Sequence, residues 1–126
     1  MPFGGVAGIV AMLSLPSSVR VFVCLVPVDM RWSFDGLAAA AERVIGQDPL
    51  SGHLFVFHGR RADRVKILYW DRDGYALWYK RLEQGVFRFP LDAREAKEIT
   101  SVDLALILEG IDLRSVKRQK RFALAR

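Results

Sequence analysis

One segment of this chain limits its possible folds more than any other. Residues 64–70 and 75–82 are rich in β-branched and aromatic side chains, and the tetrapeptide Asp71-Arg72-Asp73-Gly74 joins them. A turn of this type between two such runs is typical of a β-hairpin. Facing residues of an antiparallel pair share one side of the sheet. The segment therefore predicts a fold built on an antiparallel sheet.

The alternation along this hairpin predicts two unlike faces. We expect one face to lie in solvent and the other to pack in a core, because successive side chains of a strand point to opposite sides. The predicted solvent face carries Arg64, Lys66, Leu68, Trp70, Tyr75, Leu77, Tyr79 and Arg81. The predicted core face carries Val65, Ile67, Tyr69, Ala76, Trp78 and Leu82, with Lys80 as the exception.

Other apolar runs predict further strands. Residues 19–28, 53–58 and 86–89 have the composition of strands, and residues 54–57 are apolar on both sides, as in a central strand. Residues 91–99 are charged and show no clear period, so a loop or a helical turn is expected there.

Two helices complete the predicted fold. Ser33 can cap a helix over residues 33–45 that ends at Gly46, and the pattern Thr100-Ser101-Val102-Asp103 can cap a second helix over residues 100–109. The predicted fold class is α+β, an antiparallel β-meander of about four to five strands with two helices packed on one face.

The length and the charge distribution predict one domain with two loose ends. A chain of 126 residues fits a single compact domain, which we place at residues 12–112. Residues 1–11 carry no charge and no period, so they are expected to be a loose extension. The apolar stretch 6–15 lacks basic residues before it and is cut short by Pro16, so neither an export signal nor a membrane span is expected.

The last fourteen residues, 113–126, form a basic tail. Six of the 19 lysines and arginines lie after Asp112, where there is no acid, so the preceding residues hold 13 basic and 14 acidic side chains. Such a tail is typical of an arm for nucleic acid or an acidic partner, and equally of a solvated end. Its cations are Arg114, Lys117, Arg118, Lys120, Arg121 and Arg126.

The residues that could carry chemistry favour a protein that is not an enzyme. Cys24 is the single cysteine and lies in an apolar run, which predicts a packed thiol and a cytoplasmic protein. His53 and His58 flank one predicted strand on opposite faces, so they cannot share a metal from there. The candidate carboxylates each have an ordinary structural role. We therefore expect no catalytic residue, metal, cofactor or small-molecule substrate.

An ordered set of short blocks runs from about Met12 to Asp112. It includes Asp29-Met30-Arg31, Gly59-Arg60-Arg61 and Leu108-Glu109-Gly110-Ile111-Asp112, and the densest part lies between Asp48 and Leu82. These blocks resemble the TnpB-type (Orf2-like) accessory protein of the insertion sequence sixty-six transposable element family. The opening eleven residues are extra, and residues 93–98 look shorter and more charged than the usual linker.

The resemblance implies an accessory role in DNA transposition of a bacterial insertion sequence, beside a separate transposase. Cations and rings on the hairpin face suit contact with unpaired bases and phosphates, and the same composition suits a protein interface. An alternative function is a stand-alone nucleic-acid-binding regulator of element expression. The predicted contact residues, for DNA, RNA or the transposase, are Arg31, Arg60, Arg61, Arg64, Lys66, Trp70, Tyr75, Tyr79 and Arg81, together with the basic tail.

Overall fold

The fold was analysed in a computed structural model, which describes residues 15–90, 92–112 and 117–118. The predicted N-terminal extension and most of the predicted basic tail lie outside these residues. The elements, in chain order, are β1 (Val21–Cys24), α2 (Phe34–Ala40), the π-helical turn η1 (Ala41–Ile45), β2 (Leu54–His58), β3 (Arg64–Asp71), β4 (Gly74–Arg81), β5 (Ala96–Ile99), α3 (Ser101–Leu108), β6 (Ile111–Asp112) and β7 (Lys117–Arg118).

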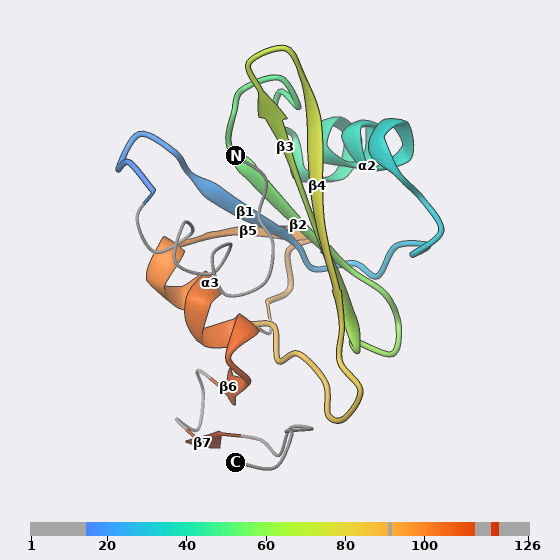
Figure 1. The fold of residues 1–126 in the computed structure, drawn as a ribbon, viewed down its shortest axis with the longest axis vertical. Helices are drawn as coiled ribbons and strands as arrows, with labels where there is room; N and C mark the ends of the chain where they lie inside the picture. Colours follow the sequence, from blue (N-terminus) through green and yellow to red (C-terminus); the bar gives the residue numbers. More distant parts are fainter. Residues whose placement is uncertain (1–14, 91, 113–116, 119–126) are drawn as a thin grey trace.

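Five of the strands form one mixed sheet in the order β4-β3-β2-β1-β5 (Figure 1). β1 and β2 are parallel, and the other neighbours are antiparallel. The predicted α+β class is confirmed, but the simple meander is wrong at its start. Parallel neighbours need a crossover connection, and α2 with η1 supplies it between β1 and β2.

The predicted hairpin is confirmed with its register. Arg64 pairs with Arg81, Lys66 with Tyr79, and Trp70 with Tyr75. Asp71 pairs with Gly74, so the turn itself consists of Arg72 and Asp73, and Arg72 adopts a left-handed conformation with φ 59. Short polar turns of this kind match the twist of the strands that they join.

The sheet is covered on both faces, so the prediction of two helices on one face is wrong. On one face, α3 packs on the core cluster that includes Val56, Ile67 and Trp78. On the other face, α2 and η1 pack on the cluster that includes Phe55 and Leu68. The physical reason lies in β2, whose five residues are all buried. A strand with apolar side chains on both faces needs cover on both.

Both predicted helices are present. Thr100 caps α3, because its Oγ1 accepts a hydrogen bond from the backbone N–H of Asp103 at 3.0 Å. Ser33 precedes α2 without such a side-chain bond. Gly46 ends η1 in the left-handed conformation, with φ 78, which glycine adopts at little cost.

Two segments differ from the prediction near the end of the chain. Residues 86–89 form no strand, although Phe87 is 2% exposed and its N–H donates to the carbonyl of Ala62 at 2.7 Å. Residues 96–99, expected to be a loop or a helical turn, form β5. β5 pairs with β1, and Arg20, which directly precedes β1, forms an ion pair with Glu98 of β5 at 2.7 Å. Charged side chains suit such an edge strand because only part of it faces a core.

The predicted solvent face of the hairpin is only partly solvated. Leu68 is 0% exposed and Lys66 is 6% exposed, and Tyr75 and Leu77 pack against the cluster under α2. The predicted core face is confirmed, since Val65 and Trp78 are buried. Cys24 is also buried, as predicted. None of the helices within the described ranges has the length and apolar character required to cross a membrane.

Candidate functional site

Most of the predicted contact residues lie at one end of the sheet. β1 and β2 run in parallel and finish at this end, β3 and β5 begin there, and β4 returns to it. The loop between β2 and β3, at the lower right of Figure 1, therefore lies beside the chain that leaves β1. A hydrogen bond from the N–H of Val28 to the carbonyl of His58, 2.9 Å long, joins the two segments.

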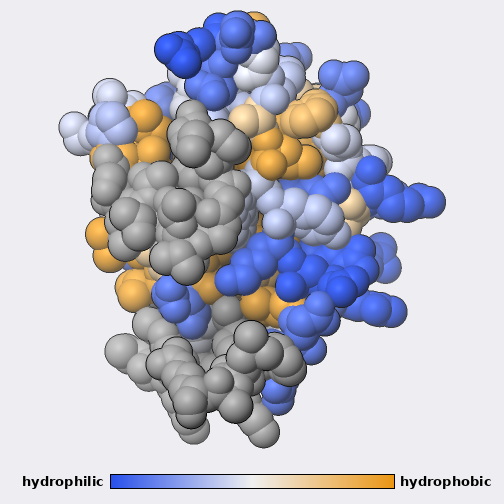
Figure 2. All heavy atoms as spheres, viewed as in Figure 1, coloured by the Kyte–Doolittle hydropathy of each residue, from blue (hydrophilic) through white to orange (hydrophobic). Residues whose placement is uncertain are grey.

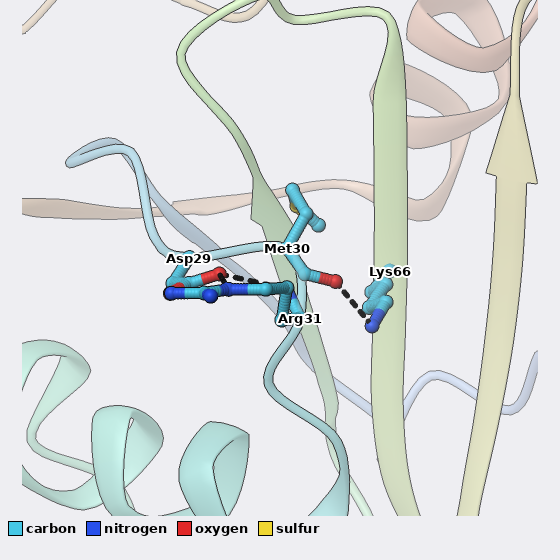
Figure 3. Close-up of polar contacts among 4 residues, drawn as sticks. All are labelled: Asp29, Met30, Arg31 and Lys66. Atoms are coloured by element: carbon cyan, nitrogen blue, oxygen red, sulfur yellow. Dashed lines mark hydrogen bonds and ion pairs between the residues drawn. The ribbon is translucent and has the colours of Figure 1, made fainter.

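The chain leaving β1 forms a compact corner at Asp29-Met30-Arg31. The Asp29 carboxylate accepts hydrogen bonds from the backbone N–H of Arg31 at 2.9 Å and from its guanidinium at 2.7 Å (Figure 3). These bonds stabilise the ionised carboxylate and lower the pKa of Asp29 to about 2. The Arg31 side chain remains 90% exposed, but its charge is already matched by Asp29.

Lys66 holds this corner against the sheet. Its ammonium donates to the carbonyls of Met30 and Trp32, at 2.8 and 2.7 Å, and lies 4.7 Å from the centre of the Tyr79 ring. Figure 3 shows the Met30 carbonyl turned toward the ammonium while the Met30 side chain points away. Burial lowers the pKa of Lys66, and the nearby Arg64 adds to that effect. Lys66, predicted as a contact residue, therefore lies inside the fold and stabilises the corner.

Gly59 allows the second segment to approach the corner. A Cβ atom at this position would lie 2.6 Å from Cγ of Met30, closer than real contacts allow. Only a residue without a side chain therefore fits between β2 and Met30 as they are placed. The side chain of Met30 and the loop 59–63 become neighbours for this reason.

These segments line an open cleft of about 360 Å³, which we call the arginine cleft. Its lining residues are Met30, Gly59, Arg60, Arg61, Asp63 and Arg64. Within the described part of the chain, no ion pair joins Arg60, Arg61 or Arg64 to a carboxylate. Three such guanidinium groups against one carboxylate favour an anionic ligand, and guanidinium geometry suits phosphate and carboxylate oxygens.

The surface around the cleft is strongly hydrophilic. Figure 2 shows hydrophilic residues gathered at the lower right, over the end of the sheet that carries the β2–β3 loop in Figure 1. Arg81 lies at the same end, beside Arg64 in the register, and is paired with Glu83 at 2.9 Å. Arg94 is likewise paired with Asp92, at 2.7 Å. Among these arginines the unpaired charge therefore lies in the cleft.

His58 ends β2, with its side chain on the face of the sheet that carries Val56 and Phe89. Its ring is 8% exposed and stacks on Phe89 with centroids 4.4 Å apart, and its Nδ1 lies 3.1 Å from the carbonyl oxygen of Gly59. Its buried Nε2 makes no hydrogen bond to any residue that the structure describes. Burial lowers the pKa of His58, since the charged ring would lose its hydration.

The predicted contact residues fall into four groups. Arg60, Arg61 and Arg64 line the cleft, and Arg31 directly follows the lining residue Met30. Tyr79 and Arg81 lie on β4, opposite Lys66 and Arg64 of β3. Lys66 is buried beneath. Trp70 and Tyr75 lie at the opposite end of the hairpin, where their rings meet edge to face with centroids 5.1 Å apart. They are half-buried and distant in register from the cleft. Lys117 and Arg118 of the predicted tail form β7, which pairs with β6.

Three lining residues were absent from the predicted contact set: Met30, Gly59 and Asp63. Each lies directly beside a predicted residue, within the blocks Asp29-Met30-Arg31 and Gly59-Arg60-Arg61-Ala62-Asp63. The signal that could have joined the two blocks is their position after two strands, because the ends of parallel strands meet at one edge of a sheet. No group of three His, Cys, Asp or Glu side chains that could hold a metal ion occurs among the described residues.

Comparison with known proteins identifies the family. The sequence profile described as IS66 Orf2 like protein matches residues 19–118, which include every residue of the arginine cleft. The chain belongs to the IS66 Orf2-like protein family. Membership makes it an accessory protein associated with transposition and confirms the family indicated by the sequence blocks.

Two relatives of this IS66 Orf2-like protein come from Sinorhizobium fredii. The uncharacterized protein y4jC is 35% identical over 108 residues, which cover 86% of this chain and 92% of the relative. The uncharacterized protein y4hO is 38% identical over 103 residues, covering 82% and 90%. No solved structure matches this IS66 Orf2-like chain.

Proposed function

We propose that this protein serves transposition of its element by binding nucleic acid through the arginine cleft, beside a separate transposase. The observation that carries the proposal is the placement of Arg60, Arg61 and Arg64 around one cleft without a carboxylate partner among the described residues. Other arginines at this end, such as Arg31 and Arg81, are already paired. A phosphate is the anion that a transposition protein meets in abundance, and arginines bind it by bidentate hydrogen bonds.

The experiment is a nucleic-acid binding titration at several salt concentrations. Arg60→Ala with Arg61→Ala should weaken binding and reduce the slope of log K against log salt by about 2, because each phosphate contact contributes about one unit. Both side chains are exposed, so the fold should persist.

A matched control variant has the same net charge as the Arg60→Ala, Arg61→Ala variant. Arg43→Ala with Arg72→Ala removes two exposed arginines, one from η1 and one from the far end of the hairpin. This variant should bind almost as well as the unchanged protein. Equal weakening by both double variants would show that net charge alone attracts the nucleic acid, and the cleft would lose its role.

A second candidate function is direct contact with the transposase. Trp32 and Phe34 are 38% and 42% exposed and lie just before and at the first residue of α2, close in sequence to Arg31. Exposed aromatic residues beside arginine have the composition of protein interface hot spots. A pull-down with the transposase of the same element, with and without nuclease, separates the two functions. Association that survives nuclease favours direct contact, and association lost with nuclease favours a nucleic-acid bridge.

A further inference from the structure

The arginine cleft borders an exposed aromatic ring whose position is fixed. Tyr79 is 48% exposed and faces Lys66, in the third pair from the cleft end of β3 and β4. The Lys66 ammonium lies 4.7 Å from the centre of the ring, and the Arg64 guanidinium lies 3.4 Å from its hydroxyl oxygen. The ring is therefore supported on one side and open on the other.

Arg64 connects the ring to the cleft. It lines the cleft, and its guanidinium touches the Tyr79 hydroxyl. A ligand that places a phosphate among Arg60, Arg61 and Arg64 would therefore have its next chemical group near the open side of Tyr79. In a nucleic acid that next group is the sugar, and the sugar carries the base.

We propose that Tyr79 stacks on an unpaired base of a nucleic-acid strand whose phosphates occupy the arginine cleft. This inference rests on the proposed nucleic-acid function and adds the class of ligand, a single strand. In a duplex the faces of the bases are stacked on each other and are closed to a side chain, whereas an unpaired base offers its face to an aromatic ring. The chemistry is shared by single-stranded DNA and RNA, because both offer phosphates and unpaired bases.

Lys66 is a positioning residue in this arrangement. It is 6% exposed and committed to two carbonyls, so it does not reach the ligand. Its ammonium supports the Tyr79 ring from beneath and fixes the Met30 corner of the cleft at the same time. The stacking surface and the phosphate site are thereby held in one geometry.

The test compares a labelled single-stranded DNA oligonucleotide with a hairpin duplex of the same length. Tyr79→Ala should raise the Kd for the single strand roughly ten- to hundredfold, the effect of losing one stacked base, and leave the Kd for the duplex almost unchanged. Tyr79→Phe keeps the ring and should stay within about threefold of the unchanged protein. Thermal unfolding of each variant confirms that it is folded.

A second readout reports stacking directly. A 2-aminopurine base in the oligonucleotide should lose fluorescence on binding to the unchanged protein and to Tyr79→Phe, and keep it with Tyr79→Ala. An RNA oligonucleotide of the same sequence shows whether DNA or RNA binds more tightly. Binding that depends on Tyr79, for either the DNA or the RNA, supports the inference.

Three outcomes separate this inference from the proposed function. If Tyr79→Ala leaves single-strand binding unchanged while Arg60→Ala with Arg61→Ala weakens it, the stacking inference is overturned and the proposed function stands. If Tyr79→Ala weakens duplex and single-strand binding equally, the stacking inference is also overturned, and the proposed function stands. If the unchanged protein binds neither oligonucleotide, both proposals fail.

Discussion

One half of a hairpin face is buried in this protein, and the other half of the same face is exposed. Toward the Asp71–Gly74 turn, Leu68 and Leu77 pack beneath α2 and η1. Away from the turn, the same alternation brings Arg64, Tyr79 and Arg81 to the surface beside the arginine cleft. Lys66 lies at the boundary, buried but capped by the carbonyls of the Met30 corner.

Strand alternation therefore assigns residues to a face of the sheet but does not decide whether that face is buried or exposed. All of these side chains share one side of the sheet. What divides them is how far the crossover segment between β1 and β2 extends across it. Where the helix lies, the face is core. Where the crossover turns at Asp29-Met30-Arg31, the face becomes the wall of a polar cleft.

The largest expected effect tests the assignment of the two faces. Trp78→Ala removes a ring that is 5% exposed and should destabilise the protein by about 3–5 kcal/mol, enough to unfold many small domains. The neighbouring Tyr79→Ala removes an exposed ring and its contact with the Lys66 ammonium, so it should cost about 1 kcal/mol or less. Urea unfolding measures both. Similar costs for the two variants would contradict the assignment.

The boundary between the two halves is tested by Lys66→Met. The change leaves the Met30 and Trp32 carbonyls without their charged donor and should destabilise the protein by about 2–3 kcal/mol. Arg64→Met, two residues earlier on the same face, should cost below about 0.5 kcal/mol because its guanidinium lies at the surface. If Lys66→Met is as mild as Arg64→Met, the corner is held by other contacts.

The cleft end of the sheet should respond to pH through His58. Its pKa is lowered by burial, so below about pH 6.5 the unfolded chain takes up a proton that the folded protein refuses. Stability is therefore complete above about pH 6.5 and falls as the pH decreases toward 5. Urea unfolding at pH 7.5 and pH 5 gives the difference.

His58→Gln should remove most of this pH dependence, because glutamine does not titrate. His53→Gln is the matched control at the other end of the same strand, where the ring is only partly buried. That variant should keep the pH dependence. An unchanged pH response in His58→Gln would assign the effect to carboxylates.

The smallest expected effect on stability belongs to the variant that tests the function of the cleft. Arg64→Ala with Arg81→Ala should change the free energy of unfolding by below about 0.5 kcal/mol for each site, since both guanidinium groups are at the surface. The same variant should impair transposition in a cell-based assay. A folded double variant that supports normal transposition would leave Arg60 and Arg61 as the only working part of the cleft.

Local chemistry explains what could be predicted from the sequence. The turn at Asp71–Gly74 determined the register of β3 and β4, which in turn determined the residues on each face. Thr100 and Asp103 marked the start of α3 because capping depends on neighbours in the chain. The family could be predicted too, since ordered blocks are a property of the sequence.

The hairpin, its register, the helix cap and the family could all be predicted from the amino-acid order, because each depends on residues that are close in the chain or on their succession. The tertiary structure decided which half of the hairpin face is covered, because that depends on the path of the crossover between two parallel strands. It also decided the role of Lys66, whose two carbonyl partners lie 36 and 34 residues away in the chain. The arginine cleft exists for the same reason: parallel strands bring their ends together, and Gly59 lets Met30 approach closely enough to close one wall.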